Sequence, residues 1–191
     1  MKGLSGEKLR VNVDRIPDEG LTIRASESTD RFPVLKDAAL EGELGFDAPL
    51  QMEVQLRRIS GLVEASGLLR TSVRLSCSRC LGAFSQLLST PFGATYGEEA
   101  PLQEELREDD EIELIADTID LFPIHDREVD LHEAIQEQVL LALPPKPLCQ
   151  VDCKGLCPGC GADLNQGACE CTEKPMDPRF AALKGLKINK D

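Results

Sequence analysis

The chain has 191 residues, of which 41% are hydrophobic, and its formal net charge is −13. This length and composition fit one globular domain with its own core, and no apolar run approaches the ~20 residues that a membrane span needs. The negative charge excludes general attraction to phosphate, and an aromatic content of 4% leaves few rings for base stacking.

The N-terminal quarter is predicted to contain short strands. Apolar residues alternate in 9–13 and 21–25, which predicts two strands joined by a turn containing Pro17 and Gly20. Residues 40–49 predict only a weak strand. The first ten residues have no apolar stretch, so we expect no export and a cytoplasmic protein in which the thiols stay reduced.

The clearest pattern runs from Leu50 to Cys77, where apolar and polar residues alternate around two glycines. A further long strand, broken near Pro91, is expected to carry four apolar residues on one face: Phe84, Leu88, Phe92 and Tyr96. Such alternation predicts an antiparallel β meander with one buried and one solvated face. Cys77 and Cys80 fall between its last two long strands, where we expect a zinc knuckle in place of an ordinary hairpin turn.

An acidic segment and one main helix follow the predicted sheet. Residues 97–117 hold ten acids against one arginine, which is typical of a solvated loop, with an acidic surface for a basic partner as the alternative. Residues 112–115 predict a short closing strand. Residues 130–143 have helical periodicity, with Asp130 as the expected N-cap and Glu133 completing a capping box before the prolines that end the helix. A last short helix is expected to start at Asp177.

Six of the eight cysteines lie within residues 149–171. Disulfides are disfavoured in a reducing compartment, and a thiol-redox motif would open a helix rather than join two strands. The spacing of Cys153, Cys157 and Cys160 matches a radical SAM motif, but too few residues follow it for the barrel of such an enzyme. Structural zinc explains the most cysteines.

The cysteines are expected to form two closed four-thiolate zinc sites, which have structural rather than catalytic roles. The first set contains a Cys-Pro-Gly-Cys-Gly knuckle and consists of Cys157, Cys160, Cys169 and Cys171. The second set uses the remaining cysteines, which are Cys77, Cys80, Cys149 and Cys153. The open alternative is that Cys153 belongs to the first set.

No catalytic constellation is evident, so we expect no enzyme and no small-molecule substrate. Arginines gather within residues 54–80, where Arg70, Arg74 and Arg79 are candidate RNA or partner contacts beside the upstream knuckle. A salt-bridged polar sheet face is the other interpretation of the same band.

The order of these motifs resembles the YceD family, or large ribosomal RNA subunit accumulation proteins. The resemblance covers residues from about 50 to 187 and is carried by the segments 77–81, 129–144, 146–165 and 177–183. It implies a bacterial or plastid protein needed for large-subunit rRNA to accumulate, with a gene often next to that of a large-subunit ribosomal protein. Some members lack the knuckle of Cys157 while keeping counterparts of Cys77, Cys80 and Cys153, which favours the two-set partition.

We therefore expect an α+β protein with an antiparallel sheet, one main helix and a cysteine-rich C-terminal segment that binds two zinc ions. One folded unit would comprise a body (1–148), the zinc segment packed on it (149–173) and a C-terminal helix and tail (174–191). The expected function is non-enzymatic support of large-subunit rRNA accumulation, by binding large-subunit rRNA or a large-subunit ribosomal protein. The alternatives are a zinc-dependent RNA-processing enzyme, a thiol-redox enzyme and a transcription-associated zinc module.

Overall fold

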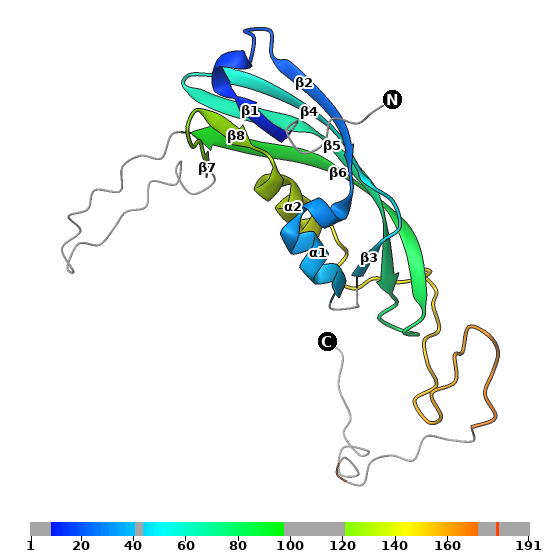
Figure 1. Ribbon diagram of the computed structural model, residues 1–191. Helices are drawn as coiled ribbons and strands as arrows, with labels where there is room; N and C mark the ends of the chain where they lie inside the picture. Colours follow the sequence, from blue (N-terminus) through cyan, green and yellow to red (C-terminus); the bar gives the residue numbers. More distant parts are fainter. Residues whose placement is uncertain (1–8, 41–43, 98–120, 172–178, 180–191) are drawn as a thin grey trace, which may run out of the picture. The chain divides into compact units, whose positions relative to one another are not determined.

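The computed structural model describes residues 9–40, 44–97, 121–171 and 179 (Figure 1). The chain divides into two compact units, of which the first consists of 1–75 and 84–145 and the second of 76–83 and 146–191. In the described residues, the first unit contains two β-sheets and two α-helices, and the second contains all eight cysteines. The acidic segment after residue 97, the strand expected at 112–115 and the helix expected from Asp177 lie outside the described residues.

The main sheet has six strands in the order β2-β4-β5-β6-β7, with β3 pairing to β5. Its strands are β2 (Leu21–Glu27), β3 (Leu44–Phe46), β4 (Leu50–Ile59), β5 (Leu62–Ser76), β6 (Ala83–Gly97) and β7 (Leu121–Pro123). β4 pairs antiparallel with both β2 and β5, as does β3 with β5, whereas β7 runs parallel to β6. The sheet is therefore mostly antiparallel, as expected, with one parallel pair that no sequence pattern indicated.

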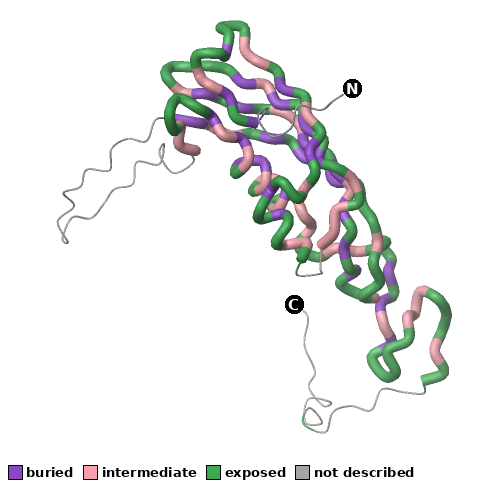
Figure 2. The backbone as a smooth tube through the Cα atoms, in the orientation of Figure 1, coloured by how far each residue is buried: buried purple, intermediate pink, exposed green. Residues whose placement is uncertain are grey.

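Alternation along β4 and β5 confirms the predicted buried face. Leu50, Val54 and Leu56 of β4 are fully buried, while the intervening Gln51 and Glu53 are exposed (Figure 2). β5 continues unbroken through Gly67. The β4 backbone passes so close to this residue that a Cβ at position 67 would lie 2.0 Å from the carbonyl oxygen of Glu53. This glycine permits close approach of two strands and does not end a strand.

β6 also runs without the break expected at Pro91. Only Thr95, Tyr96 and Gly97 of β6 pair with β7, so at Pro91 the described part of the chain pairs β6 with β5 alone. Proline is tolerated where one side of a strand is open, because its missing N–H then costs no ladder hydrogen bond. The apolar residues predicted to share a face are buried or half-buried: Phe84, Leu88, Phe92 and Tyr96.

Two α-helices in the described chain, α1 (Pro33–Leu40) and α2 (His132–Leu141), lie against one face of this sheet (Figure 1). The sequence indicated one main helix but not α1, because α1 has only eight residues and one buried side chain, Leu35. The chain entering α1 contacts α2 directly. Val34 N–H donates to Gln136 Oε1 at 3.3 Å, and the rings of Phe32 and His132 are 5.6 Å apart. No helix in the described residues is long and apolar enough to cross a membrane.

The start of α2 differs from the predicted capping box. Leu131 occupies the N-cap without a side-chain bond, while the Asp130 carboxylate accepts from the backbone N–H of His132 at 3.0 Å and contacts its Nδ1 at 2.6 Å. Burial opposes ionisation of Asp130, but these bonds from His132 outweigh it and lower the pKa of that carboxyl. Asp130 therefore accepts a hydrogen bond from the start of the helix, but it lies one residue before the N-cap and not at the N-cap as expected. In the described part of the chain, the reciprocal side-chain bond of a capping box, from Glu133, is not formed.

A separate two-stranded sheet joins β1 (Arg10–Asn12) to β8 (Glu128–Asp130). The two N-terminal strands were expected to be neighbours, but β1 pairs antiparallel with β8 and not with β2. An ion pair of 2.9 Å between Arg10 and Asp130 supports this pairing. Two 3-10 turns, Val13–Arg15 and Thr29–Arg31, follow β1 and β2.

Candidate metal centre

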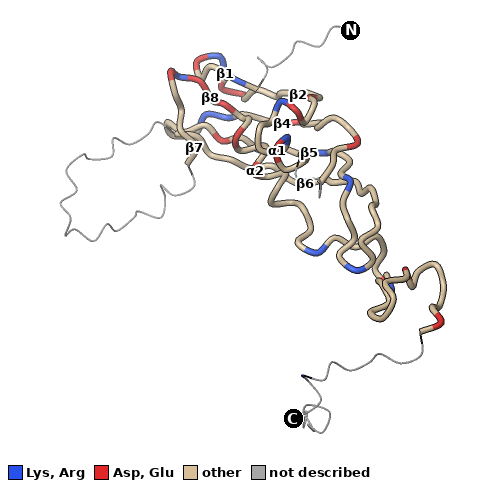
Figure 3. Tube along the Cα trace, turned by 60° about the horizontal axis from the view of Figure 1, so that its bottom comes forward, with Lys and Arg blue, Asp and Glu red and all other residues tan. Residues whose placement is uncertain are grey.

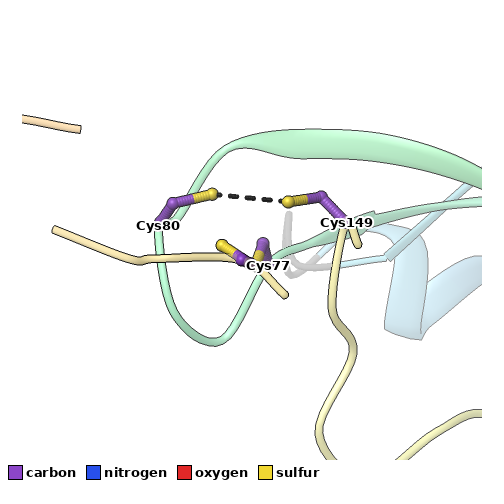
Figure 4. A group of neighbouring side chains, drawn as sticks. Cys77, Cys80 and Cys149 are labelled. Carbon is purple, nitrogen blue, oxygen red and sulfur yellow. Dashed lines mark hydrogen bonds between the residues drawn. The ribbon is translucent and has the colours of Figure 1, made fainter. Parts of the chain in front are cut away.

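Four cysteines form a compact set in the second unit, which we call the hairpin cluster: Cys77, Cys80, Cys149 and Cys153. Cys77 and Cys80 lie between β5 and β6, as predicted. The Sγ atoms of Cys80 and Cys149 are 3.7 Å apart (Figure 4). Those of Cys77 and Cys153 are also 3.7 Å apart. All four sulfurs lie within 4.8 Å of one another. These separations are far above the ~2.05 Å of a disulfide, so the set is one of free thiols.

The remaining cysteines form a second set, which we call the loop cluster: Cys157, Cys160, Cys169 and Cys171. Their sulfurs also lie within 4.8 Å of one another. A β-bridge between Leu156 and Asp163 closes the turn that carries the first two ligands. The structure thus groups the eight sulfurs as the two sets that the sequence favoured, and each set is able to hold a metal ion.

The two Cys-x-x-Cys knuckles share a pattern of backbone hydrogen bonds. The N–H of Arg79 donates to Cys77 Sγ, and the N–H of Gly159 donates to Cys157 Sγ, each at 3.4 Å. The residue after the second cysteine has a left-handed backbone in both knuckles, with φ of 60° at Leu81 and 75° at Gly161. Backbone N–H groups aimed at sulfur stabilise the thiolate, which is the form that binds metal.

The thiols within each cluster differ strongly in acidity. Backbone hydrogen bonds, the strongest involving Cys149, lower the pKa of Cys77 to about 6, and those within its own knuckle lower the pKa of Cys157 to about 6. Loss of hydration raises the pKa of Cys149 to about 12, and bonding to neighbouring thiols raises the pKa of Cys171 to about 12. Four adjacent sulfurs cannot all ionise together without a cation, so the donor set fits a bound metal ion.

The clusters differ in exposure. Two ligands of the hairpin cluster, Cys77 and Cys153, are at most 3% exposed, and one, Cys149, is exposed. The loop cluster has one buried ligand, Cys157, while Cys160 and Cys171 are exposed. Solvent and competing ligands therefore reach the loop cluster more easily.

The three candidate arginines have different surroundings. Arg70 and Arg74 are both exposed on β5 and four residues apart, so they share a face, and Arg74 forms an ion pair of 3.2 Å with Asp47. Arg79 lies in the second unit, where its Nη1 donates to the carbonyl oxygens of Val151 at 3.3 Å and Cys153 at 2.8 Å. The sequence did not indicate this structural role of Arg79, because the carbonyls that Arg79 binds are more than 70 residues away.

Neither histidine joins a metal-type cluster in the part of the chain that the structure describes. His125 forms a β-bridge with Glu128, and His132 begins α2. Asn165, which was not among the residues predicted for the site, donates to Cys153 Sγ at 3.4 Å. The sequence offers one indication of a role for Asn165, which is that it lies between Cys160 and Cys169 of the loop cluster.

Fold and site together define a protein with a mixed β-sheet unit and a second unit built around two knuckle-based thiol clusters able to hold metal ions. The chain belongs to the YceD family, because the family model described as "Large ribosomal RNA subunit accumulation protein YceD" matches residues 65–187. This match confirms the family that the sequence motifs resembled.

Similar proteins occur in plants and mycobacteria. The maize "Large ribosomal RNA subunit accumulation protein YCED homolog 1, chloroplastic" is 30% identical over 72% of this chain and 53% of its own length. The Arabidopsis thaliana protein of the same description is 27% identical over 73% and 49%, and an uncharacterized Mycobacterium tuberculosis protein is 30% identical over 71% and 61%. The chain spans about half the length of the plant relatives. No solved structure matches it.

Proposed function

We propose that this protein is a non-enzymatic factor in large ribosomal subunit biogenesis. It supports accumulation and processing of large-subunit rRNA in the cytoplasm by binding RNA or a large-subunit ribosomal protein. The observation that carries the proposal is the family match over residues 65–187, which includes all eight cysteines as well as β6, β7, β8 and α2.

The metal that we propose for both clusters is zinc, in two structural sites. A zinc–sulfur bond of about 2.3 Å gives a tetrahedral four-thiolate site sulfur–sulfur edges of roughly 3.8 Å. The two sulfur pairs of the hairpin cluster are separated by 3.7 Å, which supports this assignment. Four protein thiolates leave no open coordination position for a substrate or an activated water, so the sites would organise the chain and not catalyse a reaction.

The charges favour a basic ribosomal protein over RNA as the direct partner. The chain carries a net charge of −13, and acidic and basic positions are interspersed along the described part of the first unit (Figure 3). Arg24 pairs with Glu53 and Arg58 with Asp18, each at 2.6 Å. A net negative charge attracts the cationic proteins of the large subunit and repels phosphate. Arg70, together with Arg74 on the same face, which is paired with Asp47 at 3.2 Å, remains the candidate for a local RNA contact.

A deletion strain tests this function. Removing the gene should lower the ratio of large- to small-subunit rRNA, and the wild-type chain should restore it. An unchanged ratio in the deletion strain would overturn the proposed function.

The arginines are tested in the same strain with Arg70→Gln/Arg74→Gln, and Arg10→Gln/Arg24→Gln serves as the matched control on other exposed strand positions. We expect both variants to restore the ratio if the partner is a protein. Failure of the first variant alone, together with ultraviolet crosslinks to large-subunit rRNA that it lacks, would instead identify RNA as the partner.

A further inference from the structure

Asn165 belongs to the loop cluster by sequence but contacts a ligand of the hairpin cluster. It lies between Cys160 and Cys169, within the segment that a metal in the loop cluster would close. Its Nδ2 donates to the Sγ atom of Cys153 at 3.4 Å. Cys153 is 3% exposed, so water cannot readily replace this bond.

Every hydrogen-bonding position of the Asn165 side chain is used. Nδ2 donates to Asp163 Oδ1 at 2.6 Å as well as to Cys153, and Oδ1 accepts from Lys154 N–H at 2.8 Å and from Gln150 Nε2 at 3.2 Å. An amide offers two donors and two acceptor positions, so the side chain is saturated. The backbone N–H of Lys154 can only donate, which fixes Oδ1 toward it and leaves the NH₂ group toward the sulfur.

The backbone connects the same two clusters. Leu164 N–H donates to the carbonyl of Gly155 at 2.9 Å, and Leu156 N–H donates to the carbonyl of Arg79 at 3.2 Å. Arg79 in turn binds the carbonyl of Cys153. A continuous series of hydrogen bonds therefore runs from the loop that holds Asn165 to the knuckle of the hairpin cluster.

We propose that Asn165 is a positioning residue that couples the two metal sites, so that zinc in the loop cluster strengthens zinc binding by the hairpin cluster. This inference rests on the zinc occupancy proposed above. Metal bound by Cys160 and Cys169 restricts the segment 161–168. Asn165 is then already ordered when the hairpin cluster binds zinc, so that binding does not have to offset the entropy lost in ordering this segment. The N–H···S bond then stabilises the negative charge of the Cys153 thiolate beside the other sulfurs.

The coupling is reciprocal, but the clusters differ in which one exchanges metal first. Linkage requires that each site raise the affinity of the other by the same factor. The loop cluster has exposed ligands at Cys160 and Cys171, whereas Cys77 and Cys153 of the hairpin cluster are buried. The loop cluster thus loses zinc first when zinc is scarce, and its loss loosens the hairpin cluster.

The test measures zinc affinity of the hairpin cluster in the full-length protein. Zinc is titrated against a competing chelator, and protection of Cys80 and Cys149 from alkylation is read by mass spectrometry, which reports this cluster alone. Four proteins form a double-mutant cycle: wild type, Asn165→Ala, Cys160→Ser/Cys171→Ser, and all three changes together. Cys160→Ser/Cys171→Ser, which empties the loop cluster, should lower the zinc affinity of the hairpin cluster about tenfold, a typical coupling between sites. In the Asn165→Ala background the same two substitutions should lower that affinity little further.

Two further variants separate the N–H···S bond from general damage to the loop. Gln166→Ala is the matched control, since Gln166 bonds only to Asp163 at 3.2 Å in the described structure. Asn165→Asp keeps an acceptor for Lys154 but places a carboxylate oxygen beside the Cys153 thiolate, and it should weaken the hairpin cluster at least as much as Asn165→Ala.

The inference is overturned if emptying the loop cluster leaves the hairpin affinity unchanged, or if Asn165→Ala leaves the tenfold effect intact. If Asn165→Ala does not fold, the coupling is still tested by comparing wild type with Cys160→Ser/Cys171→Ser, and the role of Asn165 is still tested by Asn165→Asp. A wild-type protein that binds no zinc at either cluster would instead refute the metal assignment under the proposed function, and the coupling with it.

Discussion

The two knuckles of this protein have the same local geometry but different supports. In each, a backbone N–H donates to the first sulfur, and the N–H after the second cysteine bonds back to the first cysteine's carbonyl, at 2.9 Å for Leu81 and 2.8 Å for Gly161. The knuckle of Cys77 continues directly from β5 into β6, two strands of fifteen residues. The knuckle of Cys157 has only an isolated bridge beside it.

This difference explains which residue follows the second cysteine. A left-handed backbone costs a residue with a Cβ about 1–2 kcal/mol, and glycine avoids that cost. Leu81 adopts it with φ of 60° although its side chain is 68% exposed, so burial does not offset the strain. We infer that the adjoining long strands hold the first knuckle in place, whereas the second depends on Gly161.

Removing one ligand from each knuckle is the change with the largest expected effect. At saturating zinc, Cys80→Ser should lose one zinc per chain and raise hydrogen exchange in 146–153, because that segment is held to the hairpin through Cys149 and Cys153. Cys160→Ser should also lose one zinc, but with faster exchange confined to 154–171. Elemental analysis and hydrogen-exchange mass spectrometry measure both. Loss of both metals in each variant would show that the clusters are one site.

Arg79→Ala should destabilise the hairpin cluster next most strongly. It removes two hydrogen bonds from a charged donor to the carbonyls of Val151 and Cys153, worth about 1.5–3 kcal/mol in total. Arg74→Ala is the matched control, since its surface pair with Asp47 is worth only ~0–1 kcal/mol. Chelator-induced zinc release and chemical unfolding report the difference, and equal effects would argue against a structural role for Arg79.

Substitutions of the residue that follows the second cysteine of each knuckle should change the free energy of unfolding in opposite directions. Leu81→Gly should stabilise by about 0.5–1 kcal/mol, because relief of the left-handed strain exceeds the entropy that glycine adds to the unfolded chain. Gly161→Ala should destabilise by about 1–2 kcal/mol through backbone strain alone, since no described atom beyond its two chain neighbours lies within 4 Å of the added Cβ. Denaturant unfolding of the zinc-loaded proteins tests the pair. Destabilisation by Leu81→Gly would mean that the leucine side chain itself matters.

The smallest expected effect is a pH dependence of stability, which should be the same for both knuckles. The pKa values of Cys77 and Cys157 are lowered from the ordinary thiol value of 9.0 to about 6, so ionised thiolates favour the folded metal-free chain. Their contribution is complete above the unfolded pKa and is lost as pH falls through about 6. Thiolate absorbance of the metal-free protein should show this transition, with half its amplitude removed by Cys77→Ser and half by Cys157→Ser. A transition that only one substitution removes would separate the two knuckles.

The sequence by itself determined the features that depend on neighbouring residues. Alternation along residues 50–77 and 84–96 predicted long strands with a buried face, because side chains of a strand alternate with a period of two. The two-residue spacing of Cys77 and Cys80, and of Cys157 and Cys160, indicated the knuckles in the same way. The helix predicted at 130–143 exists at His132–Leu141, shortened at both ends.

Only the tertiary structure decided which distant segments meet. β1 pairs with β8 across more than 100 residues, and α1 is held by contacts of Phe32 and Val34 with α2. Neither short segment carries enough periodicity to reveal its partner, because three or eight residues sample too few turns or pleats. The bonds of Arg79 and Asn165 to the segment around Cys153 depend on side chains brought together from distant positions. No local pattern encodes such contacts, since they form only after the chain has folded.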